Sequence, residues 1–243
     1  MMDPLAPLLN LADIADAVKG ARAAVDGAYK HPALRRKGGP VAAEISLRCA
    51  VASASLVSGG YELELVRAGT VLDPVLQGSL RVAESLPSLA ARWETAPRQV
   101  FARLHVLAAT GILPAQSLGR PTASLDGVCS YIVARSGDPI IRAAVVHGDL
   151  LALDAFEAVN GIIARAAARL TLVASGLDPR GLIAAEEIHL AREPEYVGAA
   201  GAFATGTPDG IRSWLKHCTT AITQGAAIIS EVGDNSRSPA ASS

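Results

Sequence analysis

The sequence predicts an all-α protein. Half of its 243 residues are hydrophobic but only 4% are aromatic, and alanine is abundant, which suits closely packed helices. Apolar residues recur at helical spacing through most of the chain, and Gly or Pro residues separate these stretches. A chain of this length can bury a sizeable core, as one large domain or as a domain with an extension.

The N-terminal part is expected to form two helices joined by a loop. Asp3-Pro4 can start a helix, and residues 11–29 have amphipathic spacing. Residues 30–40 are rich in Lys and Arg and end in Gly-Gly-Pro. Since no aromatic residues are interleaved there, as they often are in nucleic-acid contacts, we interpret this segment as a solvated linker. Residues 41–57 have a helical pattern that Ser58-Gly59-Gly60 ends.

The middle of the chain is also mainly helical in pattern. Residues 61–67 fit a short strand or a further helix, and residues 72–91 fit a helix that contains two prolines. Residues 99–109 form an amphipathic pattern with His105 on the apolar side. A histidine in such a position is more often a hydrogen-bonded core residue than a catalyst, so we expect a structural role for it.

One segment could form the only β-structure. Residues 128–133 follow the turn signal Asp126-Gly127, and they are the candidate for a single short β-hairpin. Residues 139–153 again have a helical pattern, with His147 on an apolar face, where we expect it to bond a neighbouring carbonyl. One more short helix is expected at residues 184–191, and residues 233–243 are expected to form a disordered tail.

The overall charge and the cysteines restrict the classes of function. The formal net charge is −1, so no global field attracts nucleic acid or an anionic membrane. Cys49, Cys129 and Cys218 are isolated in sequence, which favours reduced thiols in a cytoplasmic protein over a metal site or a disulfide framework. No apolar run approaches a membrane span on inspection, and the N-terminus lacks the basic start of a signal peptide.

The fold is expected to be organised around residues 154–170, DAFEAVNGIIARAAARL. Asn160 and Gly161 tolerate the left-handed backbone of a sharp turn, and a helix rich in alanine follows. The first amides of that helix have no partner within it and carry the positive end of its dipole, so they can bind an anion. Arg165 and Arg169 lie one turn apart. On these residues alone, a helix corner with two solvated arginines is the preferred interpretation.

The same stretch resembles the signature loop of Fic-type (Fido) proteins, HPFx(D/E)GNGRxxR. Four residues match that pattern: Phe156, Asn160, Gly161 and Arg165. Five positions differ: Asp154 stands for the His, Ala155 for the Pro, Ala158 for the acidic residue, Val159 for the first Gly and Ile162 for the first Arg.

Further blocks occur in the order of that family. The resemblance covers residues 99–226 and includes an LHxxLxxG…GxxR-like block. Residues 196–203 and 208–229 resemble the family's closing pair, a Y..AL segment followed by an amphipathic helix that carries Trp214. Residues 52–59 resemble the family's inhibitory helix, (S/T)xxxE(G/N), with Ser58 at the Glu position, although a plain helix end explains them equally well. The resemblance implies a helical bundle around a central signature-loop helix. It divides the chain into an N-terminal helical extension (1–95), a Fic-like core (96–232) and the tail.

The resemblance also implies a chemistry that this loop has altered. In the family, the loop His takes a proton from a target hydroxyl that attacks the α-phosphate of ATP, the acidic residue holds Mg²⁺ and the first Arg holds phosphate. Aspartate is a weaker base than histidine, because its free pKa is about 3.9, although kinases do use an Asp in this role. Ala158 cannot ligate Mg²⁺, and Ile162 removes a charged hydrogen bond that is worth roughly 1.5–3 kcal/mol.

Two functional hypotheses follow. In the first, the chain is a degenerate Fic-like domain without AMP transfer, a binding or regulatory module for a protein partner or a second copy. In the second, it is a divergent transferase in which Asp154 is the base and Asn160, Gly161 and Arg165 hold ATP or another phosphate-bearing ligand without strong Mg²⁺ binding. No metal ligands are assigned. A nucleic-acid regulator using residues 30–37 is a third, weaker hypothesis, and we expect neither nucleic acid nor a membrane as partner.

Overall fold

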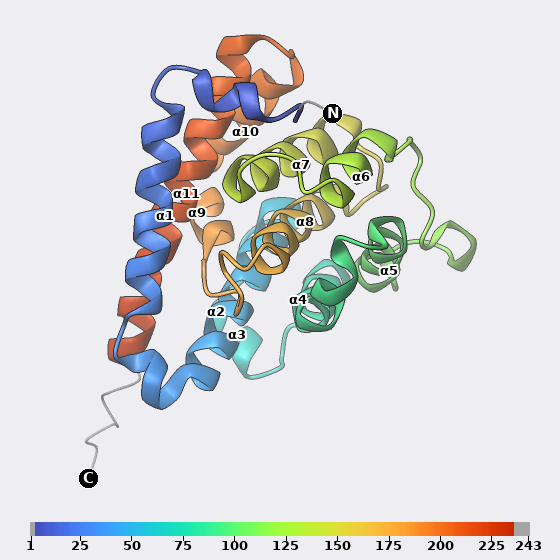
Figure 1. Ribbon diagram of the computed structural model, residues 1–243. Helices are drawn as coiled ribbons and strands as arrows, with labels where there is room; N and C mark the ends of the chain where they lie inside the picture. The colour runs from blue at the N-terminus through green and yellow to red at the C-terminus, as the bar shows by residue number, and fades with distance from the viewer. Residues whose placement is uncertain (1–2, 236–243) are drawn as a thin grey trace.

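The computed structural model describes residues 3–235, and within them it is helical with no strand (Figure 1). One isolated bridge pairs Thr110 with Leu113. Two short 3-10 helices are present, η1 (Ala6–Asn10) and η2 (Ala115–Ser117). The α-helices in chain order are α1 (Ile14–Tyr29), α2 (Ala33–Ser58), α3 (Leu63–Arg67), α4 (Pro74–Trp93), α5 (Pro97–Ala109), α6 (Asp126–Val133), α7 (Pro139–Leu153), α8 (Asn160–Ala174), α9 (Ala185–Ala191), α10 (Glu193–Ala204) and α11 (Pro208–Asn235).

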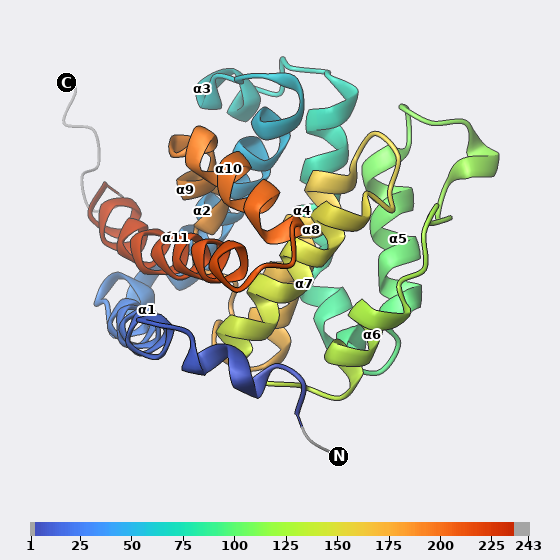
Figure 2. The same cartoon turned by 90° about the horizontal axis from the view of Figure 1, so that it is seen from above.

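The bundle is built around α7 and α8, the helices that flank the signature-like loop. Helix α8 is buried on nearly all sides, since α7, α4, α2 and α5 pack against it. Figure 2 shows α7 and α8 near the centre, with α5 on one side and α9 to α11 on the other. The all-α prediction is confirmed, and the expected helix at residues 139–153 has the bounds of α7.

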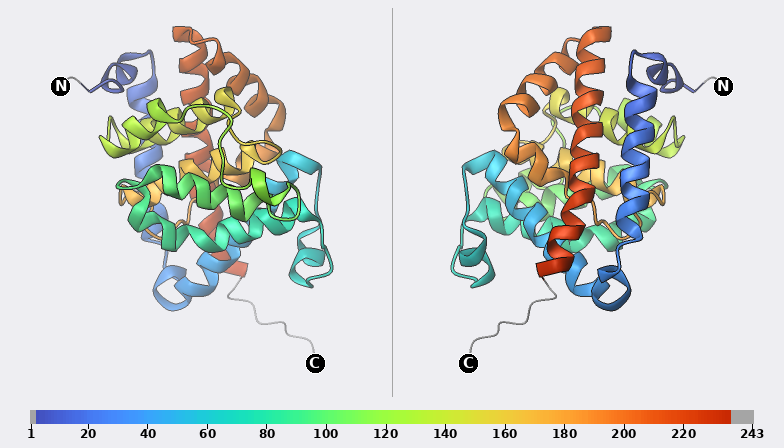
Figure 3. Two further views of the ribbon diagram at one scale, coloured as in Figure 1. Left: turned by 90° about the vertical axis from the view of Figure 1, so that its right-hand side faces the viewer. Right: turned by 90° about the vertical axis from the view of Figure 1, so that its left-hand side faces the viewer.

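The two ends of the described chain pack together along one side. Helices α1 and α11 run side by side in the same direction (Figure 3). The start of α1 is tied to α11 by an ion pair between Asp13 and Arg212, with a 2.7 Å N–O distance. Helix α11 continues to Asn235, so residues 233–235, which were predicted to begin a disordered tail, are helical. The rest of that predicted tail, residues 236–243, lies outside the described residues.

The predicted linker at residues 30–40 is wrong for most of its length. Helix α2 begins at Ala33 and continues through Gly38, Gly39 and Pro40. Ala33, Leu34 and Val41 are buried against the end of α11, and this tertiary packing overrides the weak local signals. A Cβ on Gly38 would lie 2.3 Å from the guanidinium of Arg180, an exposed side chain whose end would have to move.

The two other ambiguous segments are helices. Residues 61–67 were compatible with strand or helix, and α3 occupies Leu63–Arg67. The predicted hairpin strand at residues 128–133 is wrong, because those residues lie in α6. The buried residues of α6 are Val128, Cys129 and Ile132, which face one side of a helix. The run of β-branched residues there reflects burial in the core rather than strand pairing.

Helix α2 also bears on the membrane prediction. Its residues 38–58 are long and apolar enough to cross a membrane by length and composition, with a mean hydropathy of 1.4, which corrects the expectation that no such run exists. Half of that window is buried inside the fold, where α2 packs against α4, α8 and α9. A core helix of a folded domain meets the same criterion.

Candidate signature-loop site

The loop between α7 and α8 turns at two left-handed residues. Asp154 (φ 44°) follows the last residue of α7, and Ala158 has a φ of 62°. Asn160 and Gly161, which were predicted to supply the left-handed turn, are instead the first helical residues of α8. A short polar side chain such as Asp tolerates this conformation, whereas Ala158, which is exposed, adopts it at a steric cost.

Asp154, the candidate catalytic residue, lies on the surface. Its side chain is exposed, and its backbone carbonyl accepts a 3.4 Å hydrogen bond from the Thr122 hydroxyl. The amide of Thr122 donates to the carbonyl of Ala155 at 2.9 Å. The segment before α6 therefore holds the loop through its backbone and leaves the Asp154 carboxylate in solvent.

Phe156 anchors the loop to the core. It is fully buried, and its ring centroid lies 5.9 Å from that of Phe101 and 5.4 Å from that of His105. His105 accepts a 3.1 Å hydrogen bond at Nδ1 from the amide of Gly119. Burial lowers the pKa of His105, so it is held neutral. The expectation of a hydrogen-bonded core histidine is confirmed.

The matching Asn of the pattern faces the preceding helix. The Asn160 amide nitrogen donates to the Leu150 carbonyl at 2.8 Å, and Asn160 is buried. Its Oδ1 atom is buried without a partner in the described part of the protein. This bond joins the end of α7 to the start of α8, so the side chain of Asn160 fixes the corner.

Gly161 is explained by the arginine one turn further on. A Cβ at Gly161 would lie 3.0 Å from the Arg165 Nη1 atom, a distance tighter than ordinary packing. The guanidinium of Arg165 thus folds back over the first turn of α8, as long helical side chains do. The structure brings these two predicted site residues together, and no side chain caps the helix there.

Arg165 is buried rather than solvated. It is only 4% exposed, and its donors meet groups of two other helices. Nε and Nη2 donate to the Ser53 hydroxyl at 2.9 Å and the Ser53 carbonyl at 2.7 Å, and Nη1 donates to the Tyr196 hydroxyl at 3.3 Å. Among residues 3–235, no carboxylate forms an ion pair with it. The α2 residue that bonds Arg165 is therefore Ser53, whereas Ser58 bonds the Tyr61 hydroxyl.

Within the described residues, Arg169 but not Arg165 has a carboxylate partner that neutralises its charge. Its Nε and Nη2 atoms pair with both oxygens of Glu186 at 3.0 and 2.8 Å. It also donates to the carbonyls of Gly181 and Ile183. Both partners of this pair are buried. The interpretation of two solvated arginines is therefore wrong for Arg169 as well, which joins α8 to α9 as a structural ion pair.

Tyr196 connects Arg165 to a buried histidine cluster. The hydroxyl of Tyr196 lies 2.9 Å from His147 Nε2, so the predicted carbonyl partner of His147 is wrong. His189 stacks on Tyr196 with centroids 4.6 Å apart, and its Nδ1 lies 3.0 Å from Nε2 of His217. Burial, followed by the charge of Arg165, holds the pKa of His147 well below its usual range. The sequence offered no signal for this cluster, because its members come from four separate helices.

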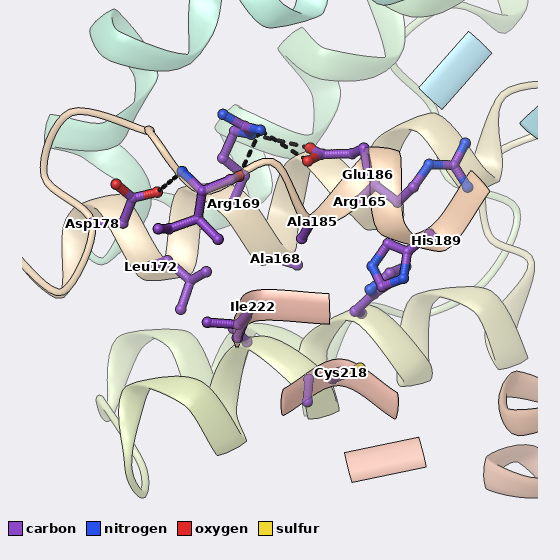
Figure 4. A pocket seen from close by; sticks show the side chains of 14 residues that line it. Arg165, Ala168, Arg169, Leu172, Asp178, Ala185, Glu186, His189, Cys218 and Ile222 are labelled. Carbon is purple, nitrogen blue, oxygen red and sulfur yellow. Dashed lines mark hydrogen bonds and ion pairs between the residues drawn. The ribbon is translucent and has the colours of Figure 1, made fainter. Parts of the chain in front are cut away.

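A small cavity borders these residues (Figure 4). It has a volume of about 30 Å³, and its charged and imidazole lining residues are His147, Arg165, Arg169, Asp178, Glu186 and His189. That volume suits one or two water molecules rather than a nucleotide. Asp154, Asn160 and Gly161 do not line it. Within the described chain, no group of three or more His, Cys, Asp or Glu residues could hold a metal ion.

Comparison with known proteins supports the fold. Neither a family model nor a curated protein sequence matches the chain. A solved structure described as a Fic family protein from Desulfovibrio desulfuricans G20 is similar over 99% of this chain and 78% of that one, with a TM-score of 0.69 and 16% sequence identity. This chain therefore has a Fic-type fold, as the signature-like stretch predicted.

Proposed function

We propose that this Fic-fold domain has lost AMP transfer and works as a binding or regulatory module. The proposal rests on one observation, the burial of Arg165 and the occupation of its hydrogen-bond donors. The one arginine that matches the signature pattern is buried, and the chain itself occupies its donors through Ser53 and Tyr196. A nucleotide phosphate would have to displace both partners.

The replaced loop residues support the same conclusion. Ile162 stands at the position of the first Arg, and its side chain is 1% exposed within the core, so the loop lacks a second cationic contact. Ala158 offers no oxygen to Mg²⁺, which prefers oxygen ligands. Asp154 adds a negative charge on the exposed side of the corner. Each change weakens the electrostatic stabilisation that phosphoryl-type transfer depends on.

The partner we propose is a protein or a second copy of the chain. Three of the six exposed large hydrophobic residues of the described structure fall between the end of α2 and the start of α4: Val57, Leu65 and Leu72. We propose this segment as the contact surface, since exposed apolar side chains that meet in one patch mark interaction sites. Three buried free thiols are in keeping with a cytoplasmic location.

The decisive experiment is an AMP-transfer assay with ATP labelled at the α-phosphate. We expect no label on the protein or on co-purified proteins with Mg²⁺ or Mn²⁺, while an active enzyme of this fold serves as the positive control. The Ser53→Ala variant, which frees the Nε donor of Arg165 and keeps the bond from Nη2 to the Ser53 carbonyl, should remain inactive as well. Labelling that Asp154→Ala abolishes would overturn the proposal. Sedimentation of the wild type beside Leu65→Ser and Leu72→Ser tests self-association.

One observation favours a second candidate, a divergent transferase for a phosphate-bearing ligand. Arg165 is a buried cation without a carboxylate partner in the described structure, and the first turn of α8 has no side-chain cap. Both features suit an anion. A screen of nucleotides and phosphorylated metabolites by thermal shift separates the candidates. A ligand-dependent stabilisation that disappears in Arg165→Met, together with turnover that depends on Asp154, would favour the transferase.

A further inference from the structure

A groove between α10 and α11 carries two cations from different helices. It has a volume of about 420 Å³, and Arg192 and Glu195 of the α10 side face Lys216 and His217 of α11 across it. The side chains of Arg192 and Lys216 are 34% and 48% exposed, and each forms an ion pair with a more exposed acid: Arg192 with Glu195, and Lys216 with Asp13 at 3.6 Å. Exposed pairs of this kind are weak, so a ligand can compete for both cations. A Cβ on Gly198, which also lines the groove, would meet no atom within 4 Å, so the space above this residue is open.

The hydroxyl groups of the groove are not used by the protein. Thr219 and Thr223, elsewhere on α11, donate their hydroxyls to carbonyls of the preceding turn. By contrast, Ser213 and Thr220 line the groove, and their hydroxyls have no hydrogen bond to any other residue of the described chain. Since Ser213, Lys216 and Thr220 lie on one face of the helix, their polar ends converge on one place.

His217 lies at the base of the groove, and its neutral ring can carry the proton on either nitrogen. His217 is 8% exposed, and its Nε2 lies 3.0 Å from His189 Nδ1, so one ring must donate and the other accept. If His189 donates, the proton of His217 is on Nδ1, which has no protein partner within the described residues. His217 then offers an N–H donor in addition to the Arg192 and Lys216 side chains.

From these features we infer that the groove binds a phosphate group, either as a phosphate monoester or as inorganic phosphate. Arg192 supplies a planar guanidinium, Lys216 an ammonium, and His217, Ser213 and Thr220 supply neutral donors, a combination that matches the several acceptors of a phosphate. The space beyond the phosphate accommodates a small organic body. Glu195 is the one carboxylate that lines the groove, and it competes for Arg192 through an exposed pair one turn apart. Such exposed pairs are weak.

Because Glu195 competes with the ligand for Arg192, substitutions in the groove should change phosphate affinity in opposite directions. Phosphate is titrated into the full-length protein by calorimetry at constant ionic strength. Lys216→Gln should weaken binding about tenfold, as expected for the loss of one charge-assisted contact. Glu195→Gln should tighten binding several-fold, because the competing carboxylate is gone. The matched control is Lys19→Gln, an exposed lysine of α1, which should bind as the wild type does.

A second measurement locates the ligand. The ring signals of His217, assigned through a His217→Gln variant, should move as phosphate is added, and the signals of His105 should not. Tighter binding of glycerol 3-phosphate than of inorganic phosphate assigns the site to organic phosphates, and the reverse assigns it to the free ion. Equal affinities of Lys216→Gln, Lys19→Gln and the wild type, or a stationary His217 signal, would overturn the inference. The groove shares no residue with the loop, so this result is independent of AMP transfer.

Discussion

Asp149 on α7 is a half-buried acid with no hydrogen bond or ion pair to any residue in 3–235. Burial alone raises the pKa of its carboxyl from 3.8 to about 6. Replacing this carboxyl by an amide of the same shape removes the cost of holding a charge there. We therefore predict that Asp149→Asn stabilises the protein at neutral pH, one helix turn before the loop.

The sign and size of this effect follow from linkage between protonation and folding. A raised folded-state pKa means that the folded state prefers the protonated acid, so stability is highest below the unfolded pKa. It falls as the pH rises from about 4 to 6 and then stays low. The rise of this pKa from 3.8 to about 6 corresponds to about 3 kcal/mol, at about 1.4 kcal/mol per pKa unit. Because the side chain is partly solvated and the amide must also be desolvated, about 3 kcal/mol is the upper bound.

Urea unfolding at pH 4 and at pH 8 measures this difference. The free energy of unfolding of Asp149→Asn should exceed that of the wild type by about 1–3 kcal/mol at pH 8 and by almost nothing at pH 4. The control is Asp26→Asn, an exposed acid on α1, which should change stability by less than about 0.5 kcal/mol at either pH. A gain of the same size at both pH values, or no gain at pH 8, would refute the assignment of the effect to a buried charge.

Three further predictions test the packing around the loop. Gly78→Ala should lower the free energy of unfolding, measured in denaturant, by about 1–3 kcal/mol, because its Cβ would lie 2.1 Å from a backbone oxygen of α5. Gly20→Ala, where a Cβ meets nothing within 4 Å, should instead gain about 0.5–1 kcal/mol. Glu186→Gln should cost about 3–5 kcal/mol, since it leaves the buried guanidinium of Arg169 without a carboxylate. Asp154→Gly should keep or slightly raise the melting temperature, because its φ of 44° favours glycine, whereas Asp154→Val should lower it.

Elements with strong local signals could be predicted from the sequence. Asp138 caps α7 by accepting from the amide of Ile140 at 2.8 Å, and Pro139 occupies the first helical position. Both are start signals that need no knowledge of the rest of the fold. Gly59 and Gly111, both with positive φ, mark the ends of α2 and α5 in the same way. The matching loop residues and the order of the blocks then indicated the fold.

The remaining errors arose where distant residues decide the outcome. Arg165 was interpreted as solvated because the sequence shows its spacing from Arg169 but not the arrival of Ser53 from α2, 112 positions away. The prediction of a linker at residues 33–40 was wrong, because burial of this segment against α11 outweighs its Gly-Gly-Pro signal. In each case the deciding contact joins segments far apart in the chain, which no local pattern records.

The loop substitutions and the burial of Arg165 support each other physically. A cationic side chain at position 162 would be enclosed in the core, since Ile162 is 1% exposed and belongs to the same buried cluster as residues of α4 and α5. The guanidinium of Arg165 already supplies one buried positive charge with no carboxylate partner among the described residues, and a second one would add repulsion in a medium of low dielectric constant. A pocket for a triphosphate needs such charges accessible to the ligand. Restoring a histidine at Asp154 would therefore return a base to the exposed corner without returning the cradle that positions its substrate.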